Sequence, residues 1–158
     1  MTIRNGVLLA LLVALALPAK TTAGTIYNVN RTIGSGLISG TIETNGVLGV
    51  LDSANILSWN LTTSDGQQRV SVLSNANSQV GVSGLLLSAT PTELQFNFTA
   101  GTGYFSMQSL VGQSFSSDFW CLDGTDKFLC TAFGPSTEVL NIADPIGNDT
   151  FFVIASRQ

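Results

Sequence analysis

The chain has 158 residues, of which 44% are hydrophobic, only 10% are charged and none is histidine. The absence of histidine excludes a Ser-His-Asp triad, a Cys-His dyad and any histidine metal ligand. Ten acidic residues outnumber six basic residues, and this balance argues against nucleic acid as a partner.

Residues 1–24 have the order of parts that is typical of a secretory signal peptide. Arg4 gives a basic start, residues 7–17 form an unbroken apolar run, and small residues at 21–24 suit a signal peptidase. A helix of that run would cover only about half of a ~30 Å hydrocarbon core, which argues against a retained anchor. We therefore expect a secreted or periplasmic protein, with one domain at 25–158.

The expected mature domain is acidic, because four basic residues face ten acidic residues and give a formal charge of −6. Such a surface repels nucleic acid and anionic membranes, so we expect no membrane contact after removal of the signal. A polysaccharide or another envelope protein remains as a partner class.

Apolar and polar residues alternate along several stretches of the mature chain, and no stretch shows a sustained helical period. In the stretch 57–62 we expect Leu57, Trp59 and Leu61 to face inward. The same alternation predicts strands at 69–72 and at 94–100, the latter with Leu94, Phe96 and Phe98 buried, and a more apolar strand at 150–155.

Turn-forming residues separate these stretches at intervals of roughly ten to twenty residues. Residues 52–55 are expected to form one short helical turn. The pattern predicts an all-β domain of about eight to eleven strands, mostly antiparallel, in a sandwich or a barrel. The turn signals are Gly34-Ser35-Gly36, Asn45-Gly46, Asp65-Gly66, Gly101-Thr102-Gly103, Asp123-Gly124 and Gly147-Asn148-Asp149.

The two cysteines of the chain, Cys121 and Cys130, flank a segment that reads as strand, turn, strand. Export permits disulfides, so we predict a structural Cys121–Cys130 bridge. The spacing is not that of a redox-active Cys-x-x-Cys pair.

Two groups of residues near this hairpin are candidates for binding. Asp118, Asp123 and Asp126 could offer carboxylate oxygens to Ca²⁺, although a polar turn explains the same residues and no cofactor is expected. Trp120 and Tyr104 are the candidate aromatic pair for stacking on a sugar, whereas Trp59 is better explained as core.

One part of the chain is similar to a recurrent pattern in exported bacterial proteins. Residues 40–51 (GTIETNGVLGVL) lead into 55–61 (NILSWNL) and an Asp-Gly turn at 65–66. This segment resembles cargo of the PEP-CTERM sorting system, which is associated with exopolysaccharide-producing bacteria. The resemblance implies an envelope or matrix location and lends no catalytic residues. Because residues 151–158 carry no sorting tail, it implies a released or periplasmic member.

Three functional hypotheses follow from these observations. The first is an exported, non-enzymatic all-β protein of the cell envelope or extracellular matrix, with a structural role or weak binding of polysaccharide or protein. The second is a small carboxylate-dependent glycan hydrolase, which needs two carboxylates about 5–9.5 Å apart at one cleft. The third is a β-barrel that binds a small lipophilic ligand in a lumen lined by Leu94, Phe96 and Phe98.

Overall fold

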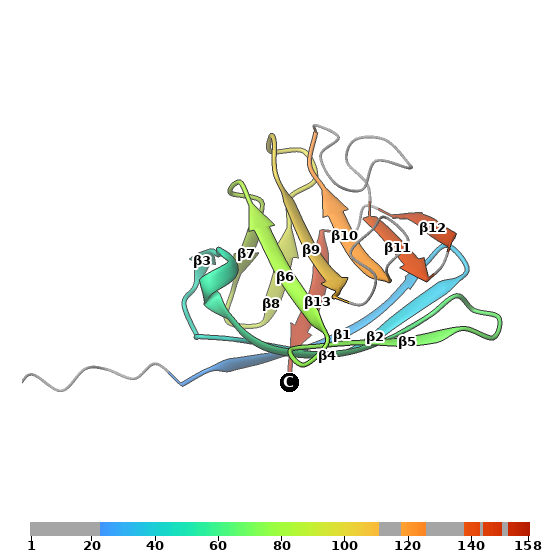
Figure 1. Ribbon diagram of the computed structural model, residues 1–158. Coiled ribbons are helices and arrows are strands. Elements are labelled where there is room, and N and C mark those ends of the chain that lie inside the picture. The colour runs from blue at the N-terminus through green and yellow to red at the C-terminus, as the bar shows by residue number, and fades with distance from the viewer. Residues whose placement is uncertain (1–22, 111–117, 126–137, 143, 150–151) are drawn as a thin grey trace, which may run out of the picture.

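Two antiparallel β-sheets face each other across a hydrophobic core (Figure 1). The computed structural model describes residues 23–110, 118–125, 138–142, 144–149 and 152–158. The first sheet has eight strands. In their order across the sheet they are β3 (Gly49–Val50), β7 (Leu87–Ala89), β8 (Glu93–Phe96), β13 (Val153–Arg157), β1 (Thr25–Ile33), β2 (Gly36–Thr44), β4 (Ile56–Ser64) and β5 (Val70–Ser74).

The second sheet has five strands, and with it the all-β prediction is confirmed as a sandwich rather than a closed barrel. The described residues hold thirteen strands, more than the eight to eleven expected, and two of them, β3 and β7, are only two and three residues long. The strands of the second sheet are, in order, β12 (Asp144–Asp149), β11 (Glu138–Ile142), β10 (Phe119–Asp123), β9 (Tyr104–Ser109) and β6 (Ser78–Ser83).

The eight-stranded sheet bends between β1 and β13. In Figure 1, β1, β2, β4 and β5 form a layer along the bottom of the view, and β7, β8 and β13 rise from it. The strand pairing between the two halves is short: Tyr27 pairs with Arg157 and Asn28 pairs with Ser156. This short junction makes a corner in the sheet.

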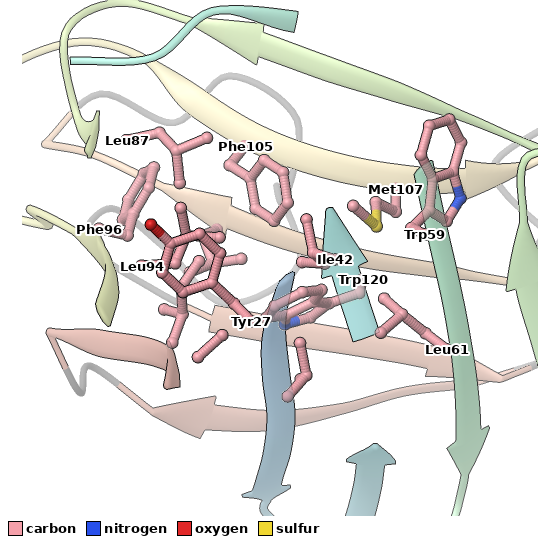
Figure 2. Packing of buried hydrophobic residues seen from close by; sticks show 14 of the residues in the cluster. Tyr27, Ile42, Trp59, Leu61, Leu87, Leu94, Phe96, Phe105, Met107 and Trp120 are labelled. Carbon is pink, nitrogen blue, oxygen red and sulfur yellow. The ribbon is translucent and has the colours of Figure 1, made fainter. Parts of the chain in front are cut away.

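Alternate side chains of both sheets point into one shared core (Figure 2). The long strands β1 and β2 bury every second residue over much of their length, as half-buried antiparallel strands do. On the inner face of the smaller sheet, the rings of Phe105 on β9 and Trp120 on the neighbouring β10 meet edge to face with centroids 5.3 Å apart. Trp59 is 9% exposed, so its prediction as a core residue is confirmed.

The hypothesis of a lipophilic lumen is wrong, because its lining residues belong to a filled core. Leu94 and Phe96 are fully buried and Phe98 is nearly so. The rings of Phe96 and Phe98 meet edge to face with centroids 4.8 Å apart. The inward orientation predicted for these three side chains is correct, but they pack against one another and against the opposite sheet.

The strand predicted at 94–100 is shorter in the structure, because β8 ends at Phe96. The side-chain Oδ1 of Asn97 accepts a hydrogen bond from the backbone N–H of Thr99, 3.1 Å away. This local bond turns the chain out of the extended conformation.

The prediction that Leu57 faces inward is wrong. The register of β4 against β2 shifts at this point, so Leu57 has no partner on β2 and lies 49% exposed. Ile56 is buried in its place, and Trp59 and Leu61 are buried as predicted. The cause is a β-bulge, which inserts one residue and reverses the inward parity on one side of it.

The strand predicted at 69–72 is present as β5, but its two valines face outward. Val70 and Val72 are 65% and 44% exposed, whereas Leu73, which pairs with Leu61, is fully buried.

The predicted turn at Asp65 is present, and the carboxylate of Asp65 accepts hydrogen bonds from the N–H groups of residues 67, 68 and 69. These bonds, the one from residue 67 most of all, hold the pKa of Asp65 below its usual range.

The predicted helical turn at 52–55 is confirmed as the 3₁₀-helix η1 (Ser53–Asn55). Asp52 caps it by accepting from the N–H groups of Ala54 and Asn55.

Within the described residues, no helix has the length and apolar character needed to cross a membrane. Residues 1–22, which include most of the predicted signal peptide, lie outside the described residues.

Candidate functional site

The predicted calcium ligands do not come together. Asp118 precedes β10 and Asp123 ends it, so the whole strand, rising about 3.3 Å per residue, separates the two carboxylates. Asp123 is fully buried, and Asp126 lies outside the described residues. The part of the chain that the structure describes contains no group of three or more His, Cys, Asp or Glu placed to hold a metal ion.

The proposed aromatic surface pair is wrong, because Trp120 is fully buried. Its indole points into the core, where the Nε1–H donates to Oε1 of Glu138 at 2.8 Å. Tyr104 alternates with the inward-facing Phe105 and therefore lies on the other face of the sheet, close against Gly81. The two rings cannot form one stacking platform.

Cys121 lies on β10 and is 2% exposed, packed with Val139 and Phe119. Its predicted partner, Cys130, lies outside the described residues, so the disulfide stays a prediction.

The sequence analysis missed a buried ion pair that joins the two sheets. Arg31 on β1 donates from Nε to Oε1 of Glu138 on β11 at 2.7 Å, and its Nη2 bonds Oε2 in the same two-pronged contact. Its Nη1 donates to the backbone oxygen of Val153 at 2.8 Å. The side chains of Arg31 and Glu138 are 9% and 0% exposed.

This ion pair couples three elements at the corner of the sheet. Arg31 holds β1 against β11 and bonds Val153 at the point where β13 leaves β1. Oε1 of Glu138 also accepts from Trp120, so the carboxylate is bonded by a charged guanidinium and by a neutral indole N–H. Desolvation of two buried charges offsets much of their attraction, so the pair fixes the geometry of the corner more than it adds net stability.

A signal for this pair was present in the sequence. Tyr27, Val29, Arg31 and Ile33 share one parity in β1, and the other three are buried core residues. A charged residue at an inward position of a strand implies a buried partner. The sequence could not identify Glu138 as that partner, because it lies 107 positions away.

A shallow pocket of about 210 Å³ opens at the same corner, where β1 and β13 separate. One wall carries Asn28 and Asn30, whose side chains are exposed, and the other is the segment 153–156 of β13. Arg31 reaches the pocket from its inner side, with its guanidinium engaged by Glu138 and Val153. The pocket wall thus offers amide and hydroxyl groups beside three apolar residues, and its one charged residue is ion-paired.

Polar side chains continue from this pocket across the outer face of the bottom layer in Figure 1. Strand pairing places Ser156, Asn28, Thr41 and Asn60 side by side on β13, β1, β2 and β4, and we call these four the polar row. With inter-strand spacings of about 4.8 Å, the polar row extends for about 14 Å. A second, exposed row of Asn30, Ser39 and Thr62 runs beside it.

The carboxylates described at this face do not supply a hydrolase pair to the pocket. No carboxylate lines the pocket itself. Glu43 accepts a hydrogen bond from Ser58 at 2.8 Å, and Glu93 accepts one from Gln95 at 2.7 Å. The pocket and the polar row are therefore suited to hydrogen bonding rather than to acid–base chemistry.

Comparisons with known proteins add no relative to this picture. No family model matches the chain, and no curated protein or solved structure matches it either.

Proposed function

We propose that this protein is an exported, non-enzymatic component of the cell envelope or extracellular matrix that binds polysaccharide weakly through the outer face of its larger sheet. The proposal rests on the polar row, in which amide and hydroxyl side chains from four strands stand side by side on a face that none of the described strands covers. Such groups form hydrogen bonds with sugar hydroxyls, both directly and through bridging water molecules.

Weak binding follows from the shape of this face. A flat sheet leaves the ligand largely solvated, so each new hydrogen bond replaces one to water and contributes about 1 kcal/mol or less. Useful affinity then requires a chain that makes many such contacts at once, as a polysaccharide does.

The acidity of the chain supports a neutral polysaccharide over an anionic surface, because its formal net charge is −4. The predicted signal peptide and the resemblance of residues 40–66 to exported cargo support the location.

The proposal is tested by measuring thermal unfolding and direct binding of the purified protein with dextran, laminarin, mannan and alginate, and with Ca²⁺ or EDTA. A ligand at a hundred times its dissociation constant adds about 2.7 kcal/mol of stability, which is readily detected. We expect a shift with at least one neutral chain and none with Ca²⁺ or EDTA. If none of the four polysaccharides raises the unfolding temperature and none binds directly, the polysaccharide function is overturned.

Export is tested separately by fractionation of the native host and N-terminal sequencing of the mature protein. We expect the protein outside the cytoplasm, starting at Gly24 or Thr25. An intact N-terminus on a cytoplasmic protein would contradict the assigned location without bearing on binding.

A further inference from the structure

The pocket between β1 and β13 has the features of a subsite for one unit of a polymer. Its volume of about 210 Å³ is below the 300–1,000 Å³ typical of sites for larger small molecules. It lies at one end of the polar row, because Asn28 belongs both to its wall and to that row. The row then leads away from it over Thr41 and Asn60.

The donors and acceptors around the pocket define the chemistry of the unit. Asn28 and Asn30 each carry an amide that both donates and accepts, and Ser156 adds a hydroxyl. Arg31 is held by Glu138 and by the backbone of Val153, so the pocket presents an internally neutralised ion pair rather than an open cation. A ligand with hydroxyl groups and no charge matches this set.

We propose that this pocket seats one neutral sugar ring of a linear polysaccharide, and that the rest of the chain crosses the strands along the polar row. The inference rests on the proposed polysaccharide function and adds to it the subsite, the charge class and the direction of the bound chain. Its structural basis is the corner between β1 and β13, where Arg31 is fixed by Glu138 and by the backbone of Val153.

The direct test compares the wild type with the double variant Asn28→Ala/Asn30→Ala in binding to laminarin, dextran and mannan. Both side chains are exposed, so the variant should fold, and its thermal unfolding is measured as a check. We expect the affinity for the neutral chain that binds to fall at least about tenfold, because two hydrogen-bonding side chains are lost. The control Gln79→Ala removes an exposed amide on β6 of the other sheet and should leave the affinity unchanged.

The direction of the chain is tested with oligosaccharides of two to six units cut from the same polymer. Affinity should rise with length, and Asn60→Ala should weaken binding of the longer oligomers while leaving the shortest unaffected. Equal loss at every length would contradict the polar row as the path of the chain.

Failure of this inference is distinguishable from failure of the proposed function. If a neutral chain binds but the double variant binds equally well, the subsite is elsewhere and the polysaccharide function stands. Binding of alginate alone would overturn the neutral ligand class. If no chain binds the wild type, both proposals fall together.

Discussion

The side chain of Asn75 extends the hydrogen bonding of β4 beyond the end of β5. Its Oδ1 accepts from the backbone N–H of Trp59 at 2.7 Å, and its Nδ2 donates to the backbone oxygen of Leu57 at 3.1 Å. The ladder between β4 and β5 stops at the pair Asn60 and Ser74, so the amide of Asn75 supplies the next partners along this edge of β4.

We expect Asn75→Ala to lower the free energy of unfolding by about 1–3 kcal/mol, because it leaves backbone groups without partners. Asn75→Asp keeps the acceptor for Trp59 and should cost less. Urea unfolding of both variants measures the difference, with Gln79→Ala, an exposed amide on β6, as the matched control. Indistinguishable stability of Asn75→Ala and the control would contradict this role.

The bulge in β4 shows where prediction from sequence ends at the residue scale. The alternation around Trp59 and Leu61 was sufficient to bury them correctly. Leu57 has the same apparent parity, but its orientation depends on the partner register, which a single strand does not encode. Trp120 was wrongly predicted to lie at the surface. Its indole can be fully buried because a distant polar partner, Glu138, accepts its N–H.

At the scale of elements, the Arg31–Glu138 pair joins β1 of the larger sheet to β11 of the smaller one. Removal of either partner takes the two-pronged ionic contact away from the other charge, which stays buried. Such losses cost about 3–5 kcal/mol in proteins, more than the net contribution of the intact pair.

We expect Arg31→Met and Glu138→Met each to destabilise the fold strongly, and the double variant to be more stable than the sum of the two losses predicts. Chemical denaturation of all four proteins completes the cycle. The residual loss in the double variant includes the indole N–H of Trp120, which loses its acceptor. Strictly additive effects would show that the two charges do not interact. If a single variant fails to fold, the cycle is repeated with Glu138→Gln in place of Glu138→Met, because glutamine keeps an acceptor for Trp120.

The alternating patterns predicted β4, β5 and β8, and the turn at Asp65 and the capped turn after Asp52 could also be predicted. The pairing of strands could not, because residues that meet in this fold are often a hundred positions apart. The pocket and the polar row depend entirely on that pairing. The fold class was therefore predictable from the sequence, whereas the candidate site became visible only in the structure.

At the scale of the whole molecule, stability should depend on pH in alkaline solution. Burial raises the pKa of Tyr27 above its usual value of 10.0, against a smaller opposing effect of Arg157. Its hydroxyl donates to the backbone oxygen of Thr90 at 2.9 Å, a bond that only the protonated form can make. The folded state thus retains this proton more tightly than the unfolded state does.

The contribution of Tyr27 is fully present below pH 10 and should be lost as the pH rises through the raised pKa of the folded state. Urea unfolding at pH 8, 10 and 11 should show a steeper loss of stability for the wild type than for Tyr27→Phe, which has no proton to release. Parallel pH profiles for the two proteins would refute the assignment.

The junction of β1 and β13 has a consequence for how the protein is made. β13 lies between β1 and β8, so the larger sheet stays divided until a segment some 130 positions beyond Tyr27 arrives to close it. Translation delivers a chain progressively, so β1 is made long before its partner β13. Completion of the sheet is therefore a late event in synthesis. A nascent chain truncated before residue 153 would lack the strand that joins the two halves.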